Sequence, residues 1–343
     1  MLNFHIIYTP DTAQLLVPFV KSLLRHSDCH FRLVSNHCTN KDKQILKSTC
    51  QKETRLTYID LPTTEKPWDH GDALNYLYER DRSEYFCFMD SDIFAAGPFM
   101  HQFLPYMESY AGIFSCSSMW MRESNKTLPL ESRSVAGRFN RSKHGHCLGS
   151  TYFAIYRRDK IDKLMSSLNM RMAKCRWSDI DLETQVKLAH LELKHEQYDT
   201  ARVLNLSLLA GGHKLYFAES TDLVHIGGVS AHKVRNGLLK KKGLSQFAFN
   251  LPEGRLRHKL LRFSVQRSWR LERHHLWQTG SYEAQRADTV VRKVIVSRYF
   301  TQLLTALTKS TAMPTIPMVD DKVIQAAIVN ATQLIVAQYE DRF

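Results

Sequence analysis

Two aspartates separated by one residue, Asp90 and Asp92, stand directly after the apolar run Tyr85 to Met89. Such a run is typical of a buried strand, and α/β proteins bind ligands beside the carboxyl ends of their parallel strands. Paired carboxylates are hard oxygen ligands that suit Mg²⁺ or Mn²⁺. A divalent cation neutralises phosphate oxygens and makes a diphosphate easier to expel. The pattern predicts a metal site for a phosphorylated ligand, although taken alone it also fits a turn with capping aspartates.

Three further polar clusters accompany this pair. His70 and Asp72 open a predicted helix whose N-terminus can face an anion. His225 ends a predicted strand just before two glycines, and its imidazole could complete the coordination of a metal. Asp179 and Asp181 flank Ile180, and either carboxylate could deprotonate a hydroxyl group. Capping of a helix N-terminus is the competing interpretation for these last two acids.

The elements that must position these residues alternate between strands and helices over the first part of the chain. Helical patterns separate short apolar runs, and this order requires crossover connections and therefore a mostly parallel sheet. The predicted strands are 4–9, 31–36, 56–61, 85–90, 111–116, 149–158, 214–219 and 223–228, and the predicted helices include 41–48, 72–81 and 159–168. The polar stretch 122–147 is predicted to be a long mobile loop. The sequence therefore predicts an α/β domain.

The positive charge of the chain is concentrated in one segment. Residues 1–232 carry 28 Lys and Arg against 26 Asp and Glu, whereas residues 233–309 carry 17 against 4. From about Pro252 the pattern is helical, with an apolar stripe at four-residue spacing from Val291 to Leu307. We therefore expect two parts, a domain at 1–232 and a mostly helical basic region at 233–343. Basic residues interleaved with aromatic ones favour an anionic membrane surface as a partner, although a solvated face packed on the core or on another subunit also explains them.

Composition narrows the class of protein. The chain has 343 residues, of which 43% are hydrophobic and 24% are charged, and this balance is typical of a globular protein. It has no apolar run long enough to span a membrane and no pattern of a secretory leader. The seven cysteines are scattered without metal-ligand spacing, which indicates a reducing compartment. We expect a cytoplasmic protein, and the basic segment favours a peripheral position at the inner face of the membrane. We expect no nucleic-acid partner because no recognition motif is present.

The order of these motifs resembles that of nucleotide-sugar-dependent glycosyltransferases of the GT-A fold, family-2-like and of the Asp-x-Asp type. The resemblance covers roughly residues 4–232, and its specificity comes from the order and spacing of short motifs. It implies a Rossmann-like, mostly parallel sheet with helices on both faces. It also implies a metal-dependent hexosyltransferase-type enzyme (EC 2.4) that uses Mn²⁺ or Mg²⁺ and a nucleotide-sugar donor, with a UDP-sugar favoured.

Carried over to this sequence, the resemblance implies roles for individual residues. Thr9 and Pro10 would lie near the nucleobase, Asn36 near the nucleoside, and Asp90, followed by Ser91, at the ribose and at metal-bound water. Asp92 and His225 would ligate the metal. The family's inverting members show Glu-Asp where this chain has Ser178-Asp179, so Asp179 is the first candidate for the base and Asp181 the second. Lys233 would contact the diphosphate as a point charge.

Several alternatives remain open at this stage. The acids favour inversion, but the glycines after His225 and the later Lys233 also resemble the pattern of retaining relatives. A nucleotidyltransferase is disfavoured because Tyr8 to Asp11 contains no glycine. A nucleotide-sugar-binding or scaffold protein could keep the fold without turnover. The acceptor is expected to be a hydroxyl group of a surface glycan, a lipid-linked molecule or an envelope precursor.

Overall fold

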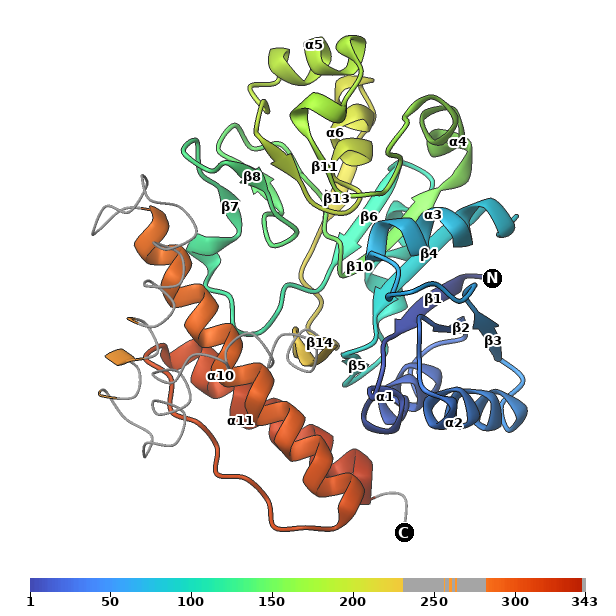
Figure 1. Ribbon diagram of the computed structural model, residues 1–343, viewed down its shortest axis with the longest axis vertical. Coiled ribbons are helices and arrows are strands. Elements are labelled where there is room, and N and C mark those ends of the chain that lie inside the picture. Colours follow the sequence, from blue (N-terminus) through green and yellow to red (C-terminus); the bar gives the residue numbers. More distant parts are fainter. Residues whose placement is uncertain (231–255, 257–258, 261–262, 264–281, 341–343) are drawn as a thin grey trace. The chain divides into compact units, whose positions relative to one another are not determined.

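The computed structural model describes residues 1–230, 256, 259–260, 263 and 282–340 (Figure 1). The chain forms two compact units. The first comprises Met1–Ser117 and Lys126–His225, and the second comprises Ser118–Asn125 and Ile226–Phe343. The second unit therefore includes a short segment from within the α/β part of the sequence. The division at residue 232 stays a prediction.

The first unit is built on a seven-stranded sheet with the order β13-β6-β10-β4-β1-β2-β3. Its strands are β1 (Asn3–Tyr8), β2 (His30–Ser35), β3 (Leu56–Asp60), β4 (Tyr85–Asp90), β6 (Gly112–Ser115), β10 (Phe153–Arg157) and β13 (Leu215–Phe217). All neighbouring strands pair in parallel except β10, which is antiparallel to both β4 and β6. The predicted α/β class with a mostly parallel sheet is confirmed.

Helices cover both faces of this sheet. They are α1 (Ala13–Arg25), α2 (Asn40–Gln51), α3 (His70–Arg80), α4 (Arg158–Ser167), α5 (Leu182–His190) and α6 (Arg202–Ala210). Right-handed crossovers place α1 and α2 on one face while the chain moves from β1 to β3, and the return to β4 places α3 on the other face (Figure 1). The apolar side chains of α1, such as Leu16, Phe19 and Leu23, are buried, as the spacing of the sequence predicts.

Short pairings outside the main sheet shape the site and its surroundings. The smaller strands are β5 (Ile93–Ala95), β7 (Thr127–Leu128), β8 (Ser134–Val135), β9 (Arg141–Ser142), β11 (Cys175–Arg176), β12 (Gln197–Tyr198) and β14 (Leu223–His225). They form the sheets β14-β5, β11-β12-β8 and β7-β9. The prediction of a long loop at 122–147 is therefore wrong in part, because this stretch holds three short strands, and two-residue strands leave too little apolar periodicity to be recognised.

Single turns of 3₁₀ helix occur in the connections, at η1 (Met100–Gln102), η2 (Leu104–Tyr106), η3 (Glu123–Asn125) and η4 (Trp177–Asp179). Of these, η3 belongs to the second unit. The other three lie in the first unit, and η4 carries one of the predicted acids.

The described part of the second unit includes the α-helices α10 (Tyr282–Lys309) and α11 (Lys322–Glu340). The predicted stripe on α10 is buried from Val291 to Leu303, and α11 buries Ile324, Ile328 and Ile335. The hydroxyl groups of Tyr299 and Thr332 join the two helices at 3.0 Å. The predicted helical character of the C-terminal part is confirmed for these residues, whereas most of the basic run after residue 232 lies outside the described residues.

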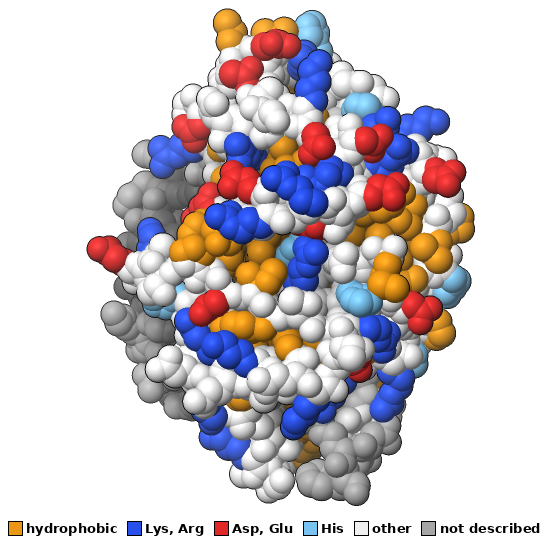
Figure 2. All heavy atoms as spheres, turned by 90° about the vertical axis from the view of Figure 1, so that its right-hand side faces the viewer, with side chains coloured by type: hydrophobic (Ala, Val, Ile, Leu, Met, Phe, Trp, Pro, Cys, Tyr) orange, Lys and Arg blue, Asp and Glu red, His pale blue; other side chains and the backbone are white. Residues whose placement is uncertain are grey.

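The surface matches the balanced charge of the first part of the sequence. On the face shown in Figure 2, lysine and arginine side chains are spread among acidic and apolar ones. Within the described part of the chain, we find no helix with the length and apolar character needed to span a bilayer.

Candidate functional site

The end of β4 and the small β14-β5 sheet bring together the three residues predicted to bind a metal. β4 ends at Asp90, and the chain turns through Ser91 and Asp92 directly into β5. β14 pairs with β5 in antiparallel register, so that His225 lies opposite Ile93. This pairing places a residue from late in the sequence beside the aspartates, and the predicted grouping of Asp90, Asp92 and His225 is observed.

The three side chains converge on one point. His225 Nε2 lies 3.2 Å from Asp92 Oδ1 and 3.5 Å from Asp90 Oδ2. One potential ligand atom from each residue lies within 4.8 Å of the others. Asp92 and His225 are buried, while Asp90 is half-buried. Asp90 is thus the member of the cluster that is partly exposed.

Hydrogen bonding fixes the orientation of the imidazole. His225 Nδ1 lies 2.9 Å from the carbonyl oxygen of Cys116. A carbonyl oxygen only accepts, so Nδ1 carries the hydrogen and Nε2 is the nitrogen turned towards the carboxylates. The backbone N–H of Asp90 donates to the carbonyl oxygen of Tyr152 at 2.7 Å, which holds the end of β4 in place. Orientation of one ring nitrogen by a carbonyl group is the usual support of a histidine that ligates a metal.

The electrostatics of the cluster favour a cation. Burial alone would lower the pKa of His225, but the carboxylates of Asp90 and Asp92 outweigh burial and raise this pKa to about 10. Two carboxylates and one imidazole nitrogen form a donor set that suits Mg²⁺ or Mn²⁺. The residues present therefore fit a divalent metal.

One acid that the sequence analysis did not select, Asp199, lies near this cluster. The ring of Tyr152 packs 4.7 Å from that of His225. Burial raises the pKa of the Tyr152 phenol, and the negative charges of Asp199 and Asp90 raise it further, so both carboxylates are close enough to act on this phenol electrostatically. Asp199 accepts a hydrogen bond from the backbone N–H of Gly137 at 2.8 Å and precedes the buried helix α6. In the sequence, the signal that could have identified Asp199 is an acid shortly before an apolar helix that is capped by Gly211.

The helix behind Asp199 holds the surrounding backbone through a buried arginine. Arg202 is fully buried, and its guanidinium donates to the carbonyl oxygens of Gly137 at 2.6 Å and Gly149 at 3.0 Å. It also donates to the carbonyl oxygens of Ala136 and Leu148. These bonds fix both the segment that contacts Asp199 and the segment that leads to Tyr152.

The two predicted bases occupy capping positions. Asp179 accepts a hydrogen bond from the backbone N–H of Arg176 at 2.8 Å, and Asp181 accepts one from the backbone N–H of Thr184 at 2.8 Å at the start of α5. Both residues are exposed, and neither belongs to the metal cluster. Burial acts to raise the pKa of Asp181, but the hydrogen bonds from Thr184 and the backbone, together with the charge of Lys187, outweigh it and lower that pKa. Their assignment as the base stays a prediction.

The predicted nucleoside residues lie at the ends of β1 and β2. Thr9 follows β1, and its carbonyl oxygen accepts a hydrogen bond from the hydroxyl of Thr12 at 2.7 Å, in the turn that contains Pro10. Asn36 follows β2 and forms a reciprocal pair with the backbone of Trp68, donating to its carbonyl oxygen and accepting from its N–H, both at 2.9 Å. The side chain of Asn36 therefore fixes the segment that carries Trp68.

The remaining predicted donor residues surround the start of α3 and the aspartate pair. His70 is the first residue of α3, and its ring meets the edge of Phe88 at 5.9 Å. Burial, and then the neighbouring carboxylate of Asp69, raise the pKa of Asp72. Ser91 is buried between the two aspartates. Lys233 lies outside the described residues.

Comparison with known proteins gives a family match over the segment that contains the aspartate pair. Residues 6–165 match the model of the family described as glycosyl transferase family 2. The predicted resemblance to Asp-x-Asp glycosyltransferases of the GT-A type is thereby confirmed for this segment. His225, Asp179 and Asp199 lie beyond it. A search of curated proteins gives no match.

Solved structures give more distant matches. An active-site mutant of LgtC is 11% identical, with a TM-score of 0.40, over 63% of this chain and 72% of that chain. A structure of S. aureus TarS is 12% identical, with a TM-score of 0.39, over 99% and 92% of the two chains. The mannosyltransferase PcManGT from Pyrobaculum calidifontis, in complex with GDP-Man and Mn²⁺, is 10% identical, with a TM-score of 0.40, over 98% and 82%. The likeness to family 2 glycosyltransferases rests on the match over residues 6–165.

Proposed function

We propose that the protein is a metal-dependent glycosyltransferase that moves a sugar from a nucleotide-sugar donor to a hydroxyl acceptor. The observation that carries the proposal is the convergence of Asp90, Asp92 and His225 at the carboxyl end of β4. Asp90 and Asp92 lie within the segment that matches family 2 glycosyltransferases, and His225 lies beyond it. When bound, a divalent metal supplies charge neutralisation of the departing diphosphate.

The sheet supplies a surface of the right length for such a donor. Asp90 is paired with Ile7 of β1, Tyr8 with Ser35 of β2, and Ser35 with Asp60 of β3. Because neighbouring strands are about 4.8 Å apart, the end of β2 lies roughly 10 Å from the metal cluster. A diphosphate and a ribose can span this distance, which supports our proposal that the nucleobase binds near the ends of β2 and β3. We favour UDP-sugars and Mn²⁺, which a nucleotide and metal screen tests directly.

Asp199 is the acid that we propose as the general base, ahead of Asp179 and Asp181. Its negative charge acts on the same phenol as that of Asp90, and it is bonded to Gly137, whereas the other two acids cap η4 and α5. The carboxylate would take the proton of the acceptor hydroxyl while the acceptor oxygen bonds to the anomeric carbon. The bond between that carbon and the diphosphate oxygen breaks, and the nucleoside diphosphate leaves with the electron pair. This step inverts the anomeric configuration, and a product of retained configuration would refute it.

The acceptor and the location of the protein are further parts of the proposal. The 17 Lys and Arg against 4 acidic residues in 233–309 favour an anionic membrane surface, and hence a lipid-linked or envelope acceptor on the cytoplasmic face. Flotation with vesicles that contain anionic lipid tests this assignment. Protein that stays at the bottom of the gradient at low salt would exclude the membrane role.

The competing function is nucleotide-sugar binding without turnover. Both functions predict that the donor stabilises the protein in the presence of metal. Only the enzyme predicts release of nucleoside diphosphate, either slowly by donor hydrolysis or rapidly with an acceptor. The experiment is therefore a turnover assay with the donor that binds, with Asp92→Asn as the control. Binding that is never followed by nucleotide release would favour the binding protein.

A further inference from the structure

The metal cluster is connected to the second unit at two points along the chain. The carbonyl oxygen of Cys116 holds the imidazole of His225, and both residues belong to the first unit. The second unit begins two residues after Cys116, at Ser118, and directly after His225, at Ile226. Both segments that leave the site are therefore parts of the second unit.

These two segments are bonded to each other immediately beyond the site. The indole N–H of Trp120 donates to the carbonyl oxygen of Gly227 at 2.9 Å. Gly227 has a φ of 73°, and a Cβ atom at this position would overlap with the side chains of Ser118 and Trp120. Ile226 is also fully buried. The residues that follow His225 therefore have little freedom to shift relative to segment 118–125.

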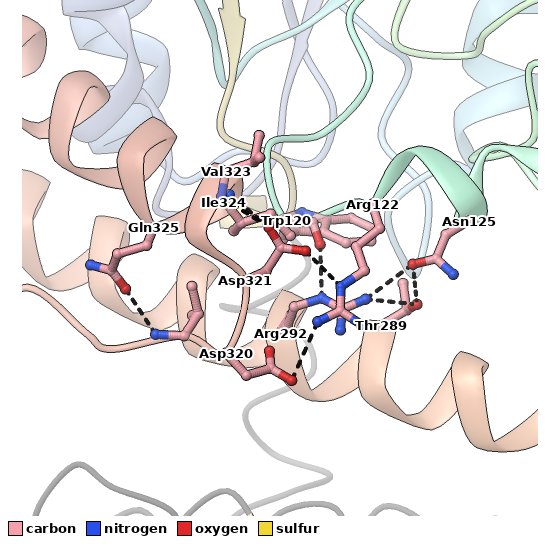
Figure 3. Close-up of polar contacts among 11 residues, drawn as sticks. Trp120, Arg122, Asn125, Thr289, Arg292, Asp320, Asp321, Val323, Ile324 and Gln325 are labelled. Carbon is pink, nitrogen blue, oxygen red and sulfur yellow. Dashed lines mark hydrogen bonds and ion pairs between the residues drawn. The ribbon is translucent and has the colours of Figure 1, made fainter. Parts of the chain in front are cut away.

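Segment 118–125 is in turn fastened to α10 by a buried arginine. Arg292 is 1% exposed, and its guanidinium donates to the carbonyl oxygen of Trp120 at 3.3 Å and to the side-chain oxygen of Asn125 at 3.0 Å (Figure 3). The hydroxyl of Thr289 donates to the same oxygen of Asn125 at 3.1 Å. Lys293, one residue along α10, lies over the ring of Trp120 at 5.2 Å. A single turn of α10 thus contacts both ends of the segment.

A second arginine fastens the segment to α11. Arg122 pairs with Asp321 at 2.7 Å and with Asp320 at 3.4 Å (Figure 3). Asp321 also accepts hydrogen bonds from the backbone N–H groups of Val323 and Ile324, at 3.0 and 3.2 Å, and so caps α11. Charged side chains therefore fix the segment to α10 and to α11. Of the two arginines involved, Arg292 is the buried one.

We propose that Arg292 and Trp120 are positioning residues for the metal ligand His225. This inference rests on the proposed metal site. The chain on either side of the Cys116–His225 hydrogen bond is held by Arg292 and Trp120, so their loss lets the carbonyl group and the imidazole drift. Removal of a group that orients a metal ligand weakens metal affinity by about 10- to 100-fold.

The test is a titration of the full chain with Mn²⁺, followed by electron paramagnetic resonance, which needs neither donor nor acceptor. For Arg292→Met we expect the Kd for Mn²⁺ to rise roughly ten-fold. For Trp120→Phe, which keeps a ring but removes the bond to Gly227, we expect a rise of roughly five-fold. Tyr299→Phe is the matched control, because it removes a polar contact between α10 and α11 without touching segment 118–125. Its Kd should stay that of the wild type.

The outcomes separate this inference from the proposed function. If wild type binds Mn²⁺, Asp92→Asn does not, and the Arg292 and Trp120 variants bind as tightly as wild type, the positioning role is refuted while the metal site stands. If wild type and Asp92→Asn behave alike, the metal site itself is refuted. An equal loss of affinity in Tyr299→Phe would show that general loosening of the helices is responsible, which also overturns the inference. Should Arg292→Met fail to fold, Trp120→Phe carries the test.

Discussion

The first unit contains two buried histidine–aspartate pairs, and they behave in opposite ways. In both, the histidine Nδ1 donates to the carbonyl oxygen of a cysteine, His5 to Cys87 at 3.0 Å and His225 to Cys116 at 2.9 Å. Burial, with a further contribution from Arg32, lowers the pKa of His5 to about 4, whereas the pKa of His225 is raised to about 10. The difference lies in the third member of each group.

The third member is a cation at one site and an anion at the other. Arg32 lies 2.8 Å from Asp81 and 3.1 Å from His5 Nε2, so the protein itself balances the buried carboxylate. At His225 the third member is Asp90, a second carboxylate. Two carboxylates and an imidazole nitrogen form a donor set that suits a divalent cation, whereas the pair at His5 already contains a cation of the chain, Arg32. The same pair of residue types is thus structural at one end of the sheet and fitted to a metal at the other.

The largest effect is expected from Asp92→Asn. Loss of a negatively charged ligand should abolish metal binding and lower turnover by at least about 1000-fold, since metal stabilisation of the leaving group contributes several kcal/mol. Asp81→Asn should leave the metal affinity unchanged. Donor turnover and Mn²⁺ titration of the two variants measure this contrast. Comparable metal affinity in both variants would remove the distinction between the two pairs.

The next effect is expected from Asp199→Asn. Removal of a general base typically lowers kcat by about 100- to 10,000-fold, while the metal ligands stay in place. Asp179→Asn and Asp181→Asn are the matched controls and should retain turnover within about ten-fold of wild type. Steady-state kinetics and a metal titration of each variant would check that turnover falls while metal affinity is retained. A larger loss in either control than in Asp199→Asn would return the assignment to the residues predicted from the sequence.

Acid should destabilise the fold through His5. The folded protein keeps His5 neutral down to about pH 4, while the unfolded chain binds a proton below its ordinary pKa of 6.5. Stability is therefore complete above this ordinary value and falls as the pH drops, by roughly 3 kcal/mol at pH 4. The pKa of Asp81 is also lowered, although burial opposes this, and it acts in the same direction. Urea unfolding between pH 7.5 and 4.5 should show a shallower dependence in His5→Phe, and an unchanged slope would contradict this account.

The smallest effect is expected from Asp181→Ala. Loss of an N-cap costs about 1 kcal/mol of unfolding free energy at neutral pH. Because the folded pKa of Asp181 is lowered, its contribution is present at neutral pH and is lost as the pH falls below about 4. Wild type and variant should therefore converge in acid. Urea midpoints at pH 7 and pH 3.5 measure this, and a difference of the same size at both pH values would show that the charge of the cap does not contribute.

These comparisons explain how far the sequence could lead. The alternation of apolar runs and helical patterns predicts the order of β1 to β4 and the sheet edge, because strand periodicity and crossover rules are local. The placement of Asp90 and Asp92 follows from the end of β4. His225 could be singled out as a possible ligand at a strand end, but only the family resemblance joined it to Asp90 and Asp92, because its approach is produced by the pairing of β14 with β5 over more than 100 residues. No local pattern encodes that pairing.

The candidate acids for the base show most clearly what the sequence alone cannot predict. Asp179 and Asp181 repeat the spacing of Asp90 and Asp92, yet they cap short helices at the surface. Asp199 belongs to no recognisable sequence motif. Only the structure identifies it, because its negative charge and that of Asp90 both raise the pKa of Tyr152. Likewise, the stripe on α10 predicts a buried helix but not that Arg292 binds segment 118–125. No periodic pattern in the sequence reveals which distant residue a polar side chain will contact.

The most direct test of the central claim is a thermal-shift comparison of wild type and Asp92→Asn with UDP, GDP and CDP and their sugars, with and without Mn²⁺. A ligand that binds the native state raises its stability according to its concentration and affinity. Our account predicts that one nucleotide stabilises wild type only when Mn²⁺ is present and does not stabilise Asp92→Asn. Equal stabilisation without metal, or in the variant, would contradict the assignment of Asp90, Asp92 and His225 as the metal site for the donor.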